Sequence, residues 1–347
     1  GIVKIFMVLG ASSGVIGALF GLFAQRSRFC LRAAVIEFWH RRFGDKLSVW
    51  LLAFASAVIT VQLMVLMGWL DTNSARQIGA TGSLSGALIG GLTFGIGMVM
   101  TRGCASRLLI LSANGNLRAL LSGLVFAVTV QASIAGWLAP ARQAMAAWWP
   151  VNGGPSRDLL QLSGIGPSGG MVLALLALAT GFYFFFKTHQ RRWGLALGAI
   201  IAGLSIALGW GLTQAIALQS FEAVQIQSLS FSSGSAEMLM RALSTSTSPS
   251  AGFDAGLLPA TFLGSLLGAL VGGDFKLEGF KTENKLGHYL IGAVLMGFGA
   301  VLAGGCTVGA GMTGGSLFSL TAWLTLIAIW LGAGMAWRIN RRMGWLI

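Results

Sequence analysis

Residues 297–315 read GFGAVLAGGCTVGAGMTGG and place one cysteine, Cys306, between a glycine pair and a second glycine-rich run. They lie within residues 289–337, which carry no charged side chain. A helix needs about 20 apolar residues to cross a bilayer, so this segment has room for two crossings with a break between them. Glycine at this density favours broken, closely packed backbone. Because such backbone inside a membrane must be covered by protein or line a wet cavity, Cys306 is expected to face the protein interior or a pathway.

The composition of the whole chain is that of a polytopic membrane protein. Of its 347 residues, 55% are hydrophobic and only 10% are charged, which excludes an ordinary soluble domain. The net charge of +13 does not indicate nucleic-acid binding, because no polar domain is present to carry a basic face. The sequence predicts a single membrane domain over residues 1–347.

Nine apolar runs are long enough to cross a membrane. They lie at about 5–25, 48–70, 83–101, 119–139, 170–186, 194–217, 255–273, 289–304 and 317–337. The two longest connections on the predicted outer side are residues 140–169 and 218–254, and the second is expected to carry a short helix near residues 236–242. The predicted fold is therefore all-α, with about nine transmembrane helices.

Positive charge predicts the orientation of these spans, because cytoplasmic loops are enriched in Lys and Arg. Of the 23 basic residues, 18 fall on one side and five, Lys4, Arg76, Arg142, Arg157 and Arg241, fall on the other. The rule predicts a periplasmic N-terminus and a cytoplasmic C-terminus.

A repeated unit places a glycine nine positions before each of the three cysteines, at residues 21–30, 95–104 and 297–306. A fourth, degenerate copy at 198–214 has Leu212 or Thr213 where the cysteine would fall. The first two units run inward and the last two outward, as an inverted duplication requires. We expect a first half at 1–139, an outer loop and linking span at 140–192, and a second half at 193–347, with broken or re-entrant half-helices at the cysteine units.

The three cysteines cannot all pair with one another and form no CxxC motif, so they are expected to be free thiols. One interpretation is a transport pathway lined by these thiols. A soft-metal transporter is an alternative, because Cys and Met ligate Cu(I) and the chain has 13 methionines. A thiol-exchange redox enzyme and a structural scaffold are further alternatives, although no CxxC pair supports the enzyme.

The sequences around the cysteines, RSRFCLRA, TRGCASR and GGCTVGAG, together resemble the YeeE/YedE family of bacterial sulphur-compound transporters. The later stretch QSFEAVQIQSLSFSSGSAEMLM is similar to an outer segment of that family. The resemblance implies a protein of the bacterial inner membrane that is not an enzyme, needs no cofactor or metal, and takes up thiosulfate along Cys30, Cys104 and Cys306. It also implies a cytoplasmic sulfurtransferase partner of the TusA type in many relatives. Some relatives are linked to selenium, so another sulphur or selenium species remains an alternative substrate.

Thiosulfate is a soft dianion, and a neutral thiol is a weak, polarizable donor that can contact it without trapping it. Backbone N–H groups at half-helix starts are expected to add positive potential, with Gly103, Gly305 and Thr307 as candidates. Close helix packing is the alternative role of the glycines.

Arg28 and Arg102, with Arg107, are candidates to receive the arriving anion. Positive-inside topology alone is the alternative explanation of these arginines. The expected order of uptake is Cys306, Cys104, Cys30, with Cys30 the least needed, because the fourth copy lacks sulfur.

Overall fold

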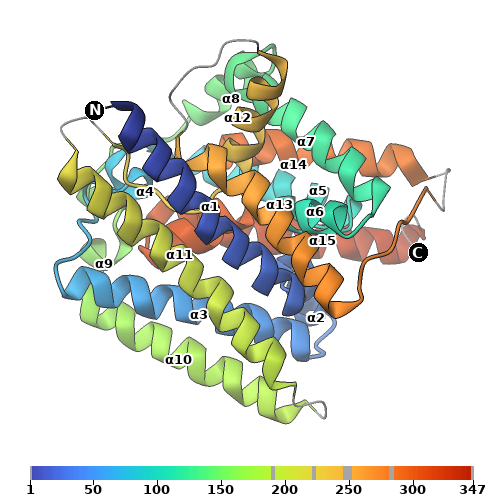
Figure 1. The fold of residues 1–347 in the computed structure, drawn as a ribbon, viewed down its shortest axis with the longest axis horizontal. Helices are drawn as coiled ribbons and strands as arrows, with labels where there is room; N and C mark the ends of the chain where they lie inside the picture. The colour runs from blue at the N-terminus through green and yellow to red at the C-terminus, as the bar shows by residue number, and fades with distance from the viewer. Residues whose placement is uncertain (1, 189–191, 221–223, 245–251, 281–284, 345–347) are drawn as a thin grey trace.

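A computed structural model describes residues 2–188, 192–220, 224–244, 252–280 and 285–344 of the chain. Almost all of its regular structure is helical, and the helices pack into one body (Figure 1). Residues 221–223, in the stretch that resembles the family's outer segment, and the basic residues Arg191 and Lys281 lie outside the described ranges.

Nine long helices carry the predicted crossings. They are α1 (Ile2–Arg26), α3 (Asp45–Leu66), α5 (Leu84–Met100), α7 (Leu117–Ala135), α10 (Gly166–Lys187), α11 (Trp193–Gln219), α13 (Phe253–Gly272), α14 (Leu286–Ala303) and α15 (Leu320–Met343). The described part of the chain has nine candidate membrane spans, one on each of these helices, which confirms the all-α, multi-pass prediction. Several ends move by a few residues, because apolar runs do not mark where a helix is capped.

Short elements fill the connections between the long helices. They are α2 (Leu31–Trp39), α4 (Arg76–Gly79), α6 (Ala105–Ala113), α8 (Ala139–Ala146), the 3₁₀ turn η1 (Pro155–Arg157), α9 (Leu159–Leu162), α12 (Phe231–Leu243) and the π-helix η3 (Thr307–Gly314). Two two-residue strands, β1 (Gly82–Ser83) and β2 (Pro150–Val151), pair antiparallel. The helix expected near residues 236–242 is α12.

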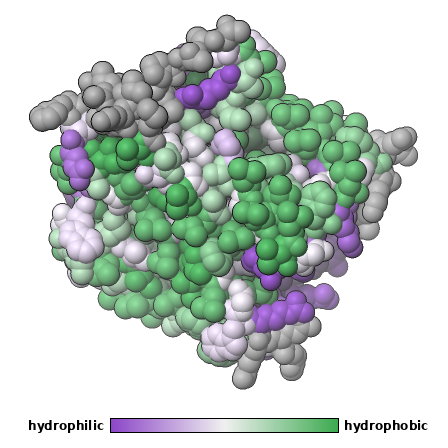
Figure 2. All heavy atoms as spheres, viewed as in Figure 1, coloured by the Kyte–Doolittle hydropathy of each residue, from purple (hydrophilic) through white to green (hydrophobic). Residues whose placement is uncertain are grey.

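Nine spans is an odd number, so nine crossings by the candidate spans of the described chain put its two ends on opposite sides of a membrane. We call the side on which α1 begins the N-side and the other the C-side. The visible face carries hydrophobic residues over a broad band, with hydrophilic ones gathered toward its upper and lower-right margins (Figure 2). This pattern fits a band in lipid between two polar edges.

The two predicted halves interlock. Helix α1 of the first half packs between α11 and α13 of the second, as Figure 1 shows, and α5 packs between α14 and α15. Apart from the four-residue α4, the order of long and short helices is the same in the two predicted halves: α1, α2, α3, α5, α6, α7 in the first, and α11, α12, α13, α14, η3, α15 in the second. An inverted repeat requires such an order, and the repeat itself stays a prediction.

Glycines make the contacts of α5 close. A Cβ at Gly95 would lie 2.8 Å from the backbone nitrogen of Ala333 on α15 and closer still to Ile329 O. A Cβ at Gly97 would lie 2.7 Å from the nitrogen of Met296 on α14. Small residues at such faces let helix backbones approach in a membrane, where apolar surface gives little drive to associate.

We therefore expect Gly95→Ala to lower the apparent melting temperature of the purified protein, because overpacking typically costs about 1–3 kcal/mol. Gly123→Ala is the matched control, since nothing lies within 4 Å of a Cβ at Gly123 of α7. Thermal unfolding in detergent measures both variants. Equal melting temperatures would contradict the close packing of α5.

Candidate functional site

Each cysteine follows a sharp break at the end of a long helix. The residue two positions earlier adopts a left-handed conformation, with φ of 54° at Arg28, 59° at Arg102 and 83° at Gly304. The next residue donates its N–H to a carbonyl five residues back: Phe29 to Ala24 at 3.0 Å, Gly103 to Met98 at 3.2 Å and Gly305 to Ala300 at 2.8 Å. These are the bonds of a Schellman motif, which ends a helix and redirects the chain.

The redirected chain places each cysteine directly before a short helix. Cys30 precedes α2, Cys104 precedes α6 and Cys306 precedes η3, each with extended backbone. The Cys306 Sγ accepts a hydrogen bond from the N–H of Gly309 at 3.4 Å. Helix starts present unpaired N–H groups and a positive dipole end, so all three thiols lie where an anion is stabilised.

The structure brings two of the three thiols together. The side chains of Cys30 and Cys104 are close enough to interact directly. Cys104 is 1% exposed and lies 3.4 Å from the Ser106 Oγ, whereas Cys30 is partly exposed. Cys306 is fully buried beside η3, and no described contact joins it to the other two. All three are free cysteines.

The predicted companions of the cysteines have different surroundings. A Cβ at Gly305 would lie 2.6 Å from the nitrogen of Ala310, so close packing accounts for this glycine, whereas a Cβ at Gly103 would make only van der Waals contacts, 3.4 Å from Leu108 and 3.6 Å from Arg107. Thr307 is 3% exposed, and its hydroxyl has no hydrogen-bond partner among the described residues.

The structure does not bring both predicted arginines to the cysteines. The Arg28 guanidinium lies 4.0 Å from the Asp274 carboxylate, and its side chain is 67% exposed. Its side chain therefore lies largely in solvent and not among the thiols. Arg102 lies on the C-side, 5.9 Å from the ring centre of Tyr289.

A cluster of arginines lies around the Cys30–Cys104 pair. Arg32 and Arg107 both interact electrostatically with Cys30, and Arg32 also with Arg102 and Arg118. Arg118 donates to Thr101 O at 2.6 Å and lies 4.7 Å from the ring centre of Tyr289. We call Arg32, Arg102, Arg107 and Arg118 the C-side arginine cluster. Arg32 and Arg107 each lie in the first turn after a cysteine. This position could have identified both from the sequence, but only Arg107 was predicted.

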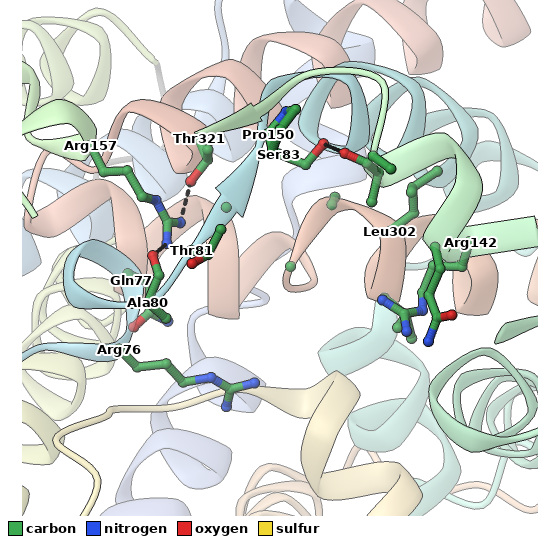
Figure 3. Close-up of a pocket in the computed structure, with 17 residues that line it drawn as sticks. Arg76, Gln77, Ala80, Thr81, Ser83, Arg142, Pro150, Arg157, Leu302 and Thr321 are labelled. Atoms are coloured by element: carbon green, nitrogen blue, oxygen red, sulfur yellow. Dashed lines mark hydrogen bonds between the residues drawn. The ribbon is translucent and has the colours of Figure 1, made fainter. Parts of the chain in front are cut away.

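A cavity of about 510 Å³ opens on the N-side, and we call it the N-side pocket (Figure 3). Its cationic residues are Arg76, Arg142 and Arg157, and none of its lining residues is acidic. In Figure 3 the side chains of Arg76 and Arg142 extend toward its open centre from opposite sides. A cavity with three guanidinium groups and no carboxylate attracts anions.

Arg157 is the most buried cation of the N-side pocket, at 7% exposure. It donates to Ala80 O and, at 2.6 Å, to the hydroxyl of Thr321, so no carboxylate neutralises it through these bonds. Burial lowers the pKa of Arg157 to about 10, because desolvation disfavours the charged form. It therefore remains cationic at neutral pH.

Residues that line the N-side pocket also lie next to Cys306. Gly304, two residues before Cys306, lines the pocket. Gln77 also lines it and donates to Gly309 O at 3.4 Å, while the N–H of the same glycine bonds the Cys306 sulfur. The pocket and the buried thiol thus share neighbours.

A smaller cavity of about 200 Å³ lies on the C-side, between Arg102, Arg118 and Tyr289. Glu278 also lines it and accepts a 2.8 Å hydrogen bond from the side chain of Asn116. The site therefore has a basic pocket on the N-side, Cys306 beside it, and a thiol pair near basic residues toward the C-side.

Comparison with known proteins gives consistent results. The sequence profile of a family described as sulphur transport matches residues 26–335. The chain is 27% identical over 343 residues to a protein of Spirochaeta thermophila named thiosulfate transporter TsuA, covering 94% of this chain and 98% of that protein. It is 24% identical over 352 residues to the Escherichia coli protein of the same name, covering 93% of each. A third relative, probable transporter YedE of Escherichia coli, is 36% identical over 90 residues, which cover 25% of this chain and 22% of that protein.

Proposed function

Because this chain belongs to the YeeE/YedE family of sulphur transport proteins, we propose that it takes up thiosulfate across a bacterial inner membrane along its three thiols. The observation that carries the proposal is the N-side pocket, where three arginines and no acid lie next to buried Cys306. Two relatives matched over nearly their whole length are named thiosulfate transporters.

In this proposal the N-side is periplasmic, because 18 of the 23 Lys and Arg fall on the other side. Thiosulfate first gathers in the N-side pocket, where charge-assisted hydrogen bonds from guanidinium groups replace part of its hydration. It then passes to Cys306 and on to the Cys104–Cys30 pair. The C-side arginine cluster receives it before release to the cytoplasm.

Thiols suit the middle of such a route, because arginines there would hold the dianion too tightly. A neutral S–H is a weak donor with a polarizable sulfur, so it contacts the terminal sulfur of thiosulfate and releases it. The dipole ends of α2, α6 and η3 add positive potential without a mobile charge. We call this passage the cysteine relay.

The basic C-side also fits the docking of a TusA-like sulfurtransferase that consumes the delivered anion. Consumption would offset the cost of moving two negative charges inward, about 4–5 kcal/mol against 100 mV.

Uptake of radiolabelled thiosulfate into liposomes that contain the purified protein tests the proposal. We expect saturable uptake that unlabelled thiosulfate abolishes and that equal concentrations of sulfate or selenite reduce far less. Uptake equal to that of empty liposomes would contradict thiosulfate transport. Competition by selenite or Cu(I) that is stronger than competition by unlabelled thiosulfate would indicate another substrate.

A further inference from the structure

The three helices that follow the cysteines, α2, α6 and η3, have a fourth counterpart in the fold. The fourth is α12, and the residue before it is Ser230. In chain order α12 follows α11 as α2 follows α1. Ser230 therefore holds the position in the second half that Cys30 holds in the first.

The backbone angles support this correspondence. Cys30 has φ −161° and ψ 114°, and Ser230 has φ −146° and ψ 127°. Cys104 has φ −80° and ψ 173°, and Cys306 has φ −82° and ψ −172°. The four capping residues thus form two matched pairs, one member in each half.

Ser230 packs against the first turn after Cys306. Its hydroxyl oxygen would lie 2.7 Å from a Cβ at Gly309, the residue whose N–H bonds the Cys306 sulfur. The hydroxyl of Thr313 on η3 donates to Leu229 O at 2.7 Å and fixes the loop before Ser230. Ser230 is 8% exposed, so its hydroxyl lies in the same buried region as the Cys306 thiol.

The two halves of the route therefore differ in chemistry. Toward the C-side, the capping residues of α2 and α6 form the Cys30–Cys104 thiol pair. Toward the N-side, the capping residues of α12 and η3 bring a hydroxyl and a thiol to Gly309. A third group points to a ligand here, because the buried hydroxyl of Thr307 has no hydrogen-bond partner among the described residues.

Thiosulfate has two different ends, a soft terminal sulfur and three harder sulfonate oxygens. A hydroxyl is a stronger donor to oxygen than a thiol, and a thiol suits the soft sulfur. Ser232 lies 3.2 Å from the Ser230 oxygen and can donate to it, which leaves the Ser230 proton available.

We propose that Ser230 is a fourth anion-contacting residue, whose hydroxyl donates to a sulfonate oxygen of thiosulfate while Cys306 contacts the terminal sulfur. This inference rests on the proposed function. It makes the N-side step selective for an anion that carries both kinds of end, which sulfate does not.

Kinetics of thiosulfate uptake into liposomes test this role with Ser230→Ala, Ser230→Cys and the control Ser235→Ala. Ser235 lies on the same helix, and its hydroxyl bonds only the local Phe231 O, at 2.6 Å, among the described contacts. Losing a hydrogen bond to a charged ligand should raise the KM of Ser230→Ala about tenfold or more. Ser230→Cys retains a weak donor, so its KM should lie between that of Ser230→Ala and that of the unchanged protein. The KM of Ser235→Ala should equal that of the unchanged protein.

A second measurement does not depend on transport rate. In Ser230→Cys, mass spectrometry follows alkylation of the thiol introduced at position 230. Thiosulfate should slow this alkylation at least threefold, and sulfate at the same concentration should not.

Wild-type KM in Ser230→Ala, or alkylation that thiosulfate does not slow, would overturn the role of Ser230. If uptake still requires Cys306 in that case, the proposed function stands and only this inference fails. If the unchanged protein carries no thiosulfate, both fail.

Discussion

Replacing Cys306 with alanine should lower thiosulfate uptake by about ten- to a hundredfold. The thiol is fully buried beside the N-side pocket, and its removal leaves the anion without a soft donor at the first step of the cysteine relay. A hydrogen bond to a charged partner is worth about 1.5–3 kcal/mol, and 1.4 kcal/mol corresponds to a factor of ten. Growth on thiosulfate as the sole sulphur source and uptake by liposomes both report the loss.

Controls separate this effect from misfolding. Met312→Leu changes another fully buried residue of η3 and should leave uptake within about twofold, because volume-conserving changes are tolerated. Cys104→Ala should lower thiosulfate uptake as much as Cys306→Ala does. Cys30→Ala should lower uptake less, because Cys30 is only partly buried and its proposed counterpart is a serine. Normal growth of both Cys306→Ala and Cys104→Ala at unchanged protein levels would refute the relay.

Removing two arginines from the N-side pocket should raise the KM for thiosulfate about a hundredfold. Arg76→Gln with Arg142→Gln is the sharpest variant, because both side chains extend toward the open centre of the pocket (Figure 3). Each guanidinium contributes a charge-assisted contact with the dianion. The maximal rate should change little, since the thiols downstream are intact. Arg157 is a poorer choice, because its bonds to Ala80 and Thr321 also hold the fold.

Arg241→Gln supplies the control for net charge. Arg241 lies on the same side of the membrane but pairs with Glu237 at 3.0 Å and does not line the pocket. Its loss should leave the KM unchanged. The KM of the unchanged protein should also rise with salt, and this dependence should weaken in the double variant. An equal KM in Arg241→Gln and the double variant would refute capture in the pocket.

Much of the fold could be predicted because hydropathy and glycine act locally. Nine apolar runs give nine long helices in the part of the chain that the structure describes, and the glycine-rich residues 297–315 contain the break at Gly304. The fourth unit could not be placed this way. The sequence suggested Leu212 or Thr213 as the counterpart of a cysteine, but both lie inside α11, which continues to Gln219. In the correspondence proposed above, the counterpart is Ser230, 17 or 18 positions further on, because a longer connection precedes α12.

The site was only partly predictable, because it depends on contacts between distant segments. Three connections supply the arginines of the N-side pocket, Arg76, Arg142 and Arg157. The charge count identified them only as a minority of basic residues on the outer side, and it did not indicate that they line one pocket. The sequence identified Cys30 and Cys104 as equivalent units but did not indicate that their thiols meet. Arg28 was expected near a thiol, but its guanidinium lies 4.0 Å from the carboxylate of Asp274, a contact between distant segments.

The most direct test of the relay is to locate the soft end of the anion. Selenosulfate replaces the terminal sulfur of thiosulfate with selenium, whose anomalous scattering identifies it in crystals soaked above the KM. The relay predicts selenium within about 4 Å of the sulfur of Cys306 or of the Cys30–Cys104 pair. Selenium found only among the arginines of the N-side pocket, in a protein that transports selenosulfate, would contradict it.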